Sequence, residues 1–114
     1  VNLWKDSIPH RRCLIPASGF YEWQHLNEKD KQQFIFKPPQ GIMHIAGIYK
    51  MFTENEGTRM PQYSMITTEP NATVKNVHDR MPLVLLPGEW DTWLRGDYKI
   101  LAERTSVLLD KTAV

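Results

Sequence analysis

The chain has 114 residues, of which 41% are hydrophobic and 24% are charged, and its net charge is +1 at pH 7. These values are typical of one globular domain, so we expect residues 1–114 to form a single domain. The near-neutral charge excludes a uniformly basic nucleic-acid binder, and no apolar run approaches the ~20 residues that would span a bilayer.

The first predicted elements are a short helix and a pair of strands. Trp4 and Ile8 have helical spacing within residues 1–10, and Pro9 lies close to the end of that helix. Two short strands follow in residues 12–23, because Pro16 and the small residues 17–19 interrupt the apolar pattern.

The second of these strands carries a candidate catalytic carboxylate. Side chains alternate along a strand, so Phe20 and Glu22 share one face while Tyr21 and Trp23 share the other. A carboxylate flanked by aromatic residues suits proton transfer. The alternative is a half-exposed Glu22 on an edge strand, paired with a lysine or an arginine, and this stretch by itself favours the alternative.

The remaining elements predict a strand-rich antiparallel α+β fold, with a curled or barrel-like sheet and short helices near the ends. Gly47 in the apolar, central strand predicts a close backbone approach or a bulge. Trp90, Trp93 and Leu94 form a helical stripe that favours core packing. In chain order we expect strands at 33–37, 43–51, 63–67 and 83–86, a helical turn at 72–77, and helices at 90–94 and 98–109.

Cysteine and histidine usage narrows the chemistry. Cys13 is the single cysteine, which rules out a disulfide within the chain and fits a reducing, cytoplasmic compartment. It lies in an apolar strand, so we expect a buried small side chain. The four histidines have no ligand-like spacing, and we expect neither a metal nor a cofactor.

Two motifs together resemble the SRAP family, the SOS response-associated peptidase domain. The first is Gly-Phe-Tyr-Glu-Trp at residues 19–23, and the second is His-Asp-Arg-Met-Pro at residues 78–82, after an Ile-Thr-Thr strand at 66–68. The order of the motifs is specific to that family, and the resemblance covers most of residues 12–94.

The resemblance implies a domain that recognises abasic sites in single-stranded DNA and forms a reversible covalent crosslink to them. In this family the α-amine of an amino-terminal cysteine attacks the sugar aldehyde, and the thiol then closes a thiazolidine ring. By motif match Glu22 would shuttle protons and His78 would protonate or stabilise the sugar oxygen and the imine. Without the match, the residues favour the alternative that His78 is an ordinary surface loop histidine.

Several other residues are candidate DNA contacts. Trp23 is a candidate for base stacking, with a core indole as the alternative. Arg11, Arg12 and Arg80 are candidates for phosphate contacts, although the first two are also typical of a solvated strand entrance and Arg80 of an ion pair with Asp79. Thr67 and Asn71 are candidates for hydrogen bonds to DNA or the sugar, with turn capping as the alternative.

The sequence also departs from the family pattern. It lacks the Met-Cys-Gly-Arg start, an Asn-Ala-Arg-x-Glu-type motif and the usual closing strand, so we expect the carboxy-terminal portion of an SRAP domain. Such a portion would not crosslink DNA alone, and sheet edges exposed by truncation would allow dimerisation.

Two other functions stay open at this point. One is a non-catalytic single-stranded-DNA-binding or relic module that uses Arg11, Arg12 and Arg80. The other is a literal self-processing peptidase, for which a Cys13–His78 dyad is a poor candidate because a strand-buried thiol is a weak nucleophile.

Overall fold

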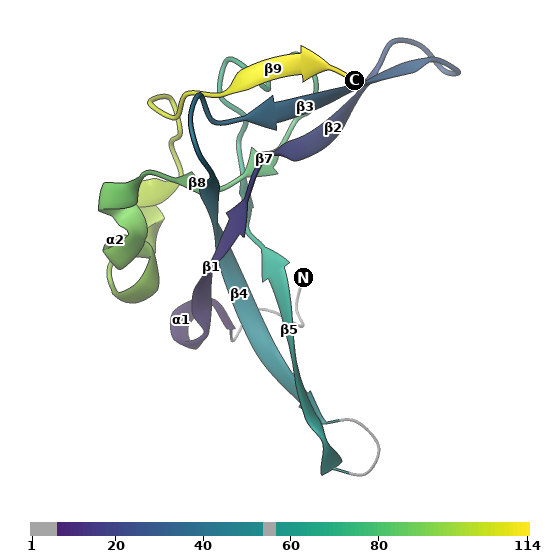
Figure 1. Ribbon diagram of the computed structural model, residues 1–114. Coiled ribbons are helices and arrows are strands. Elements are labelled where there is room, and N and C mark those ends of the chain that lie inside the picture. Colours follow the sequence, from purple (N-terminus) through teal and green to yellow (C-terminus); the bar gives the residue numbers. More distant parts are fainter. Residues whose placement is uncertain (1–6, 54–56) are drawn as a thin grey trace.

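The computed structural model describes residues 7–53 and 57–114, and these form an α+β fold of antiparallel strands with short helices (Figure 1). The strands in chain order are β1 (Arg12–Ala17), β2 (Phe20–His25), β3 (Lys31–Lys37), β4 (Met43–Thr53), β5 (Arg59–Met65), β6 (Thr67–Thr68), β7 (Met81–Pro82), β8 (Val84–Leu85) and β9 (Asp110–Ala113). The helices are α1 (Ser7–His10), η3 (Pro87–Glu89), α2 (Trp90–Arg95) and η4 (Tyr98–Leu101). The predicted fold class is therefore confirmed.

The strands form three separate sheets, and within the described residues none of them closes into a barrel. The largest has the order β1-β4-β5, and β8 pairs with β4 beside β5. The second has the order β2-β3-β9, and β6 pairs with β7 in the third. All pairings are antiparallel.

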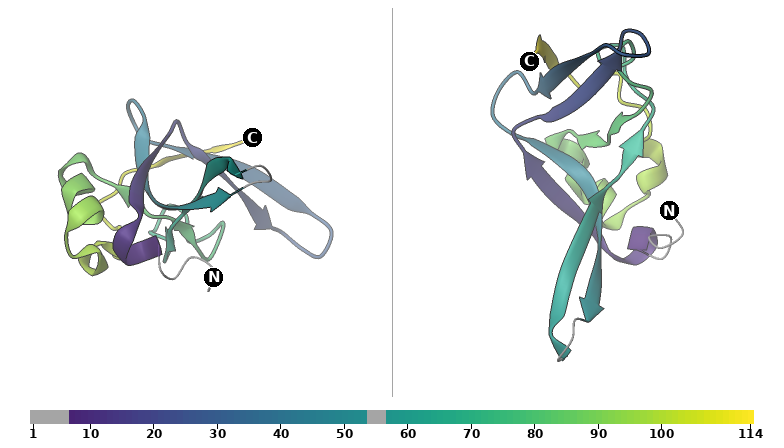
Figure 2. Two further views of the ribbon diagram at one scale, coloured as in Figure 1. Left: turned by 90° about the horizontal axis from the view of Figure 1, so that it is seen from below. Right: turned by 90° about the vertical axis from the view of Figure 1, so that its right-hand side faces the viewer.

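Strand β4 is the central element, as its apolar run predicted. It pairs with β1 through residues 43–48, with β8 through His44 and Ile45, and with β5 through residues 47–53. Beyond β1 the β4–β5 ribbon extends away from the rest of the fold (Figures 1 and 2). A Cβ atom at Gly47 would lie 2.6 Å from Cδ1 of Ile15 and 3.0 Å from Sγ of Cys13, so the glycine leaves room for side chains of β1 and not for the predicted close backbone approach.

Two apolar clusters fill the interior. One lies between the β2-β3-β9 sheet, the end of β4 and residues 74–77, and includes Phe20, Phe36, Ile45 and Val74. The other packs the opposite face of β4 against α2, and it centres on Trp93, whose indole Nε1 donates a hydrogen bond to the Cys13 carbonyl at 2.8 Å. The tryptophan stripe is thus core packing, as predicted.

The chain differs from the sequence prediction mainly after residue 97. The predicted helix over 98–109 is wrong: η4 ends at Leu101, residues 102–109 are irregular, and β9 follows. Strand β9 pairs with β3 from Phe34↔Ala113 to Lys37↔Asp110, so the closing strand expected to be absent is present. At the other end, Trp4 of the predicted first helix lies outside the described residues.

The predicted fifth strand is also interrupted. It runs as β5 to Met65 and resumes as β6 at Thr67, while the Ile66 amide donates to the Ala46 carbonyl at 2.9 Å. The predicted turn over 72–77 is present as successive hydrogen-bonded turns, such as His78 N–H to the Val74 carbonyl at 3.0 Å. Within the described residues no helix is long and apolar enough to cross a membrane.

Candidate active site

The structure brings Glu22 and His78 together from segments 56 positions apart in the sequence. Glu22 lies in β2, and His78 directly follows the turn of residues 72–77; its Nδ1 is 3.7 Å from Glu22 Oε2. The side chains are 27% and 38% exposed, respectively, so a ligand can reach both groups. This separation is longer than a hydrogen bond, and a small shift of either side chain would bring the two groups within the ~2.6–3.2 Å over which a proton is transferred.

The strand pattern explains the orientation of Glu22. Phe20 is buried against Phe36, with ring centroids 5.0 Å apart, and it directs the same face of β2 toward the core. Glu22 is two residues further along and emerges at the margin of that core, opposite Phe34. The predicted alternation of β2 is therefore confirmed.

His78 is also close to its sequence neighbour. Its Nε2 lies 3.5 Å from Oδ1 of Asp79, whose side chain is 91% exposed. The imidazole therefore has one half-buried and one exposed carboxylate partner, one at each ring nitrogen. This arrangement allows proton exchange between the Glu22 side and bulk solvent.

Arg80 and Thr67 form a local pair beside this site. Nη2 of Arg80 donates to the Thr67 carbonyl at 2.9 Å and Nε donates to Oγ1 at 3.3 Å. The expected ion pair between Asp79 and Arg80 is not among the ion pairs of the described residues. The Arg80 guanidinium is exposed and its charge has no carboxylate partner there, so it remains available to an anion.

Asn71 occupies a different role from its neighbours. Its side-chain oxygen accepts from the backbone N–H groups of Thr73 and Val74, at 3.2 and 3.4 Å. Its side-chain amide donates to the carbonyls of Arg104 and Val107, at 3.3 and 3.1 Å. This geometry is that of the turn-capping alternative.

Trp23 lies on the solvent face of β2, not in the core. It is 41% exposed, Tyr21 on the same face is 59% exposed, and Nζ of Lys31 lies 4.4 Å from the Trp23 ring centroid. This face is opposite to that of Glu22, so Trp23 and the Glu22–His78 pair lie on different sides of the strand.

Arg11 and Arg12 lie away from the pair, where β1 begins beside α1. Arg11 donates to Ser7 Oγ at 2.9 Å and to the Tyr49 carbonyl at 3.1 Å. Arg12 donates to the Gly96 carbonyl at 3.1 Å and its guanidinium lies 4.9 Å from the Tyr98 ring centroid. Both guanidinium groups therefore contact other elements of the fold, and the structure does not bring them to Glu22.

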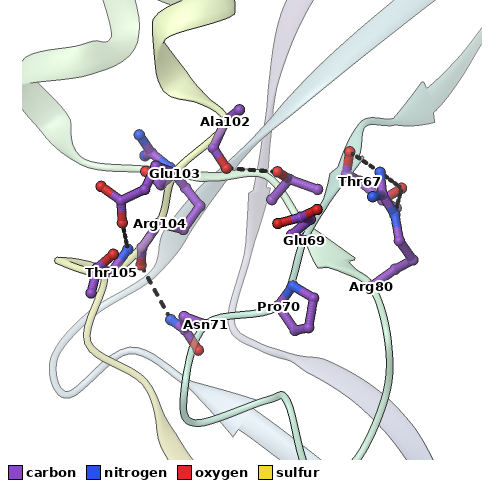
Figure 3. Close-up of a pocket in the computed structure, with 10 residues that line it drawn as sticks. Thr67, Glu69, Pro70, Asn71, Arg80, Ala102, Glu103, Arg104 and Thr105 are labelled. Carbon is purple, nitrogen blue, oxygen red and sulfur yellow. Dashed lines mark hydrogen bonds between the residues drawn. The ribbon is translucent and has the colours of Figure 1, made fainter.

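A polar depression of about 640 Å³ lies beside the Arg80–Thr67 pair (Figure 3). Residues 67–71 and Arg80 form one side, and residues 102–105 form the other; Thr68 Oγ1 donates to the Ala102 carbonyl at 2.7 Å. A neighbouring depression shares Glu69 and Pro70 and extends to Lys75 and Asp79, next to His78. The two hollows share a polar lining, and Asp79 and Arg80, which directly follow His78 in the sequence, lie along it.

Sequence reasoning missed the buried ion pair behind this depression. Arg104, only 6% exposed, donates from Nη1 and Nη2 to the two carboxylate oxygens of Glu89, at 2.6 and 2.9 Å. The hydrogen bond from Arg104 holds the pKa of Glu89 below its usual range. The sequence predicts Glu89 just before the helix over 90–94 and Arg104 within a helix over 98–109, and their spacing carries no signal for this pairing.

The position of Cys13 agrees with the prediction that its thiol is a poor nucleophile. The thiol is partly buried in β1, and burial raises its pKa, which lowers the thiolate fraction at neutral pH. Among residues 7–53 and 57–114, no group of three or more His, Cys, Asp or Glu side chains is arranged to hold a metal ion.

The fold and the pair define a class: an antiparallel α+β protein with an accessible carboxylate–imidazole pair. The family profile described as "SOS response associated peptidase (SRAP)" matches residues 1–113. The chain belongs to the SRAP family.

Relatives with similar sequences carry a common name. "Abasic site processing protein YoaM" of Bacillus subtilis is 38% identical over 92 residues, covering 80% of this chain and 40% of that protein. "Abasic site processing protein HMCES" of Xenopus tropicalis is 29% identical over 102 residues, covering 73% of this chain and 30% of that protein. The matched part of the chain thus covers less than half the length of each of these relatives.

A solved structure agrees on the fold. A protein from Bacteroides thetaiotaomicron superposes with a TM-score of 0.81 at 24% identity, over 96% of this chain and 52% of that one. This likeness concerns the arrangement of the strands and helices.

Proposed function

We propose that this chain carries the glutamate–histidine part of a site that processes abasic sites in single-stranded DNA. The observation that carries the proposal is the 3.7 Å separation between Glu22 Oε2 and His78 Nδ1, with both side chains accessible. The relatives' names supply the substrate class, because they are called abasic site processing proteins. Family membership, shared motifs and the geometry all support the same two residues.

The chemistry at an abasic sugar divides naturally between the two groups. Opening the sugar ring requires that a proton leave the anomeric hydroxyl and that another reach the ring oxygen. Glu22 accepts and returns the first proton, and protonated His78 donates the second. Attack of an amine on the resulting aldehyde expels water and gives an imine, and addition of a thiol to the imine carbon closes the thiazolidine ring.

The nucleophile must come from outside the 114 residues. The crosslink requires the amine and the thiol of an amino-terminal cysteine, whereas the only cysteine here is Cys13, inside β1. On this proposal the family's peptidase label describes a single self-processing step that exposes this cysteine. Reversal of the crosslink uses the same pair in the opposite direction.

The proposed DNA contacts lie around the pair. Arg80 and Thr67 flank the polar depression, where the guanidinium can bind a phosphate. Trp23 offers an exposed indole for base stacking on the face of β2 opposite to Glu22, so it would contribute only to DNA that also passes along that face. Arg11 and Arg12 would contribute only if the DNA extends past the beginning of β1.

A denaturing gel assay tests the proposal. Single-stranded DNA with one abasic site is incubated with this chain and with a longer version whose amino-terminal segment begins Cys-Gly-Arg. We expect a denaturation-resistant complex only with the longer version, and a roughly 10²–10⁴-fold slower reaction after Glu22→Gln or His78→Ala. Matched controls are Glu28→Gln and His25→Ala, which change exposed residues near the end of β2.

Two outcomes would contradict the proposal. Equal rates for Glu22→Gln and Glu28→Gln would remove Glu22 from the chemistry. Salt-dependent DNA binding without any crosslink in either version, lost on Arg80→Ala, would support the non-catalytic binding module instead.

A further inference from the structure

The turn that carries His78 is held mainly by side chains at its two ends. Residues 71–78 contain no helix or strand, and successive turns such as Lys75 N–H to the Asn71 carbonyl, at 2.9 Å, shape the backbone. Val74 and Val77 are buried in the core below Phe20, which fixes how deeply the turn sits. These apolar contacts are not directional, and polar contacts add directional constraints on the position of His78.

Asn71 fixes the first end of the turn. All four hydrogen-bonding positions of its side chain are used: the oxygen accepts from Thr73 and Val74, and the amide donates to the carbonyls of Arg104 and Val107. No donor or acceptor remains for a ligand unless one of these bonds is broken.

The acceptor of Asn71 is itself anchored. Besides the bidentate pair with Glu89, the Arg104 guanidinium donates to the Val84 carbonyl at 3.1 Å, next to the β4–β8 pairing. The carbonyl that receives the Asn71 amide therefore belongs to a residue fixed to the central sheet. Through this hydrogen bond, Asn71 fixes the start of the turn relative to the central sheet.

Gln24 fixes the other end. Its Nε2 donates to the Asn76 carbonyl at 2.9 Å, two residues before His78. Gln24 also lies two residues after Glu22 on the same face of β2. This single hydrogen bond therefore connects the strand that carries the carboxylate to the turn that carries the imidazole.

We propose that Asn71 and Gln24 are positioning residues that set the distance between Glu22 and His78. The inference rests on the proposed function of that pair. It also reassigns Asn71, because the hydrogen bonds that fill its side chain position the turn and are not available to DNA. A displacement of about 1 Å between reacting groups can lower a rate by roughly 100-fold, so both contacts matter for the reaction although neither touches the sugar.

The test compares Asn71→Ala and Gln24→Met with Gln62→Met as a matched control. Methionine preserves the length of glutamine but cannot donate, and Gln62 lies exposed on β5 in another sheet. In the 114-residue chain we expect the nuclear Overhauser effect between the His78 ring protons and the Glu22 side-chain protons to weaken in both variants and not in the control.

The kinetic measurement uses the longer, cysteine-bearing version with abasic single-stranded DNA. For both variants we expect the crosslinking rate at saturating DNA to fall by roughly 10- to 100-fold while the half-saturating DNA concentration stays unchanged. A raised half-saturating concentration with an unchanged rate would make Asn71 a DNA contact and overturn the proposal.

The remaining outcomes are equally decisive. If Asn71→Ala fails to fold, Gln24→Met decides alone, because Gln24 is at the surface; an unchanged Overhauser effect and rate would overturn the proposal. If Glu22→Gln leaves the rate unchanged, the proposed function fails, while the Overhauser effect still decides whether the two amides position His78.

Discussion

Replacing Glu89 by glutamine tests whether the buried ion pair stabilises the fold. The substitution keeps the shape and the oxygen that accepts from the Leu86 N–H at 2.8 Å, but it removes the charge that faces Arg104. Only 4% of the Arg104 side chain is exposed, so an unpaired guanidinium would remain buried.

The structure gives a magnitude for this loss. Breaking one side of a buried ion pair costs about 3–5 kcal/mol. We expect about 3 kcal/mol, the lower end, because the Glu89 side chain is 24% exposed and Arg104 keeps its bond to the Val84 carbonyl. The matched control is Asp91→Asn, whose partner Arg95 is largely exposed; that surface pair should contribute about 0.5 kcal/mol or less.

Urea denaturation at pH 7 measures both variants, as a change in midpoint at constant slope. The pKa of Glu89 is lower in the folded chain, so its contribution is fully present above the ordinary glutamate pKa of about 4.3. It is lost as the pH falls through the lowered folded-state value, and the difference between wild type and Glu89→Gln should shrink there. Equal destabilisation by Glu89→Gln and Asp91→Asn at pH 7 would refute the reasoning.

Three further substitutions or reactions give independent expectations. Gly19→Ala should destabilise the fold by about 1–3 kcal/mol, because its Cβ would lie 2.7 Å from the Phe36 carbonyl oxygen. Gly88→Ala is the control, since a Cβ there meets nothing within 4 Å, and thermal unfolding measures both variants. Trp93→Phe should lower the free energy of unfolding, measured in urea, by about 2–3 kcal/mol, because it leaves a cavity and removes the hydrogen bond to the Cys13 carbonyl. A smaller loss of stability than that of Gly88→Ala would contradict this expectation. Iodoacetamide should alkylate Cys13 more slowly at pH 7 than a free thiol, and its rate should continue to rise above the usual thiol pKa, because burial raises the pKa of Cys13.

The sequence predicted the strands whose side chains show a strong pattern. The alternation in β2 and the apolar run of β4 follow directly from burial on one or both faces, and the tryptophan stripe of α2 follows from packing on β4. Strand β9 has no such pattern, since all four of its residues are exposed and its place depends on pairing with β3. Of the apolar residues before it, Leu101 is buried from the end of η4 and Val107 from the irregular segment 102–109, and their spacing imitated one continuous helix.

The candidate site was predictable only in part. Nothing in the spacing of Glu22 and His78 indicates that they meet, and only the family motifs suggested it; the structure supplies the 3.7 Å separation. The contacts of Asn71, Gln24 and Arg104 join distant segments, so sequence patterns, which report local periodicity, could not reveal them. The catalytic assignment itself stays a prediction.

The two margins of the β1-β4-β5 sheet each carry a proline, Pro16 in β1 and Pro61 in β5. The Tyr49 amide of β4 points toward β1, to the Arg11 carbonyl, whereas the Ala46 amide points away from β1. Backbone groups alternate in direction along an antiparallel ladder, and Pro16 pairs with His44 while Pro61 pairs with Met51. Both prolines therefore turn their nitrogen atom away from β4, toward the outside of the sheet. A strand added at either margin would find no donor at that position. The sheet therefore resists lateral growth, which protects an exposed ribbon from aggregation and limits any dimer to contacts that avoid a continuous ladder across these prolines.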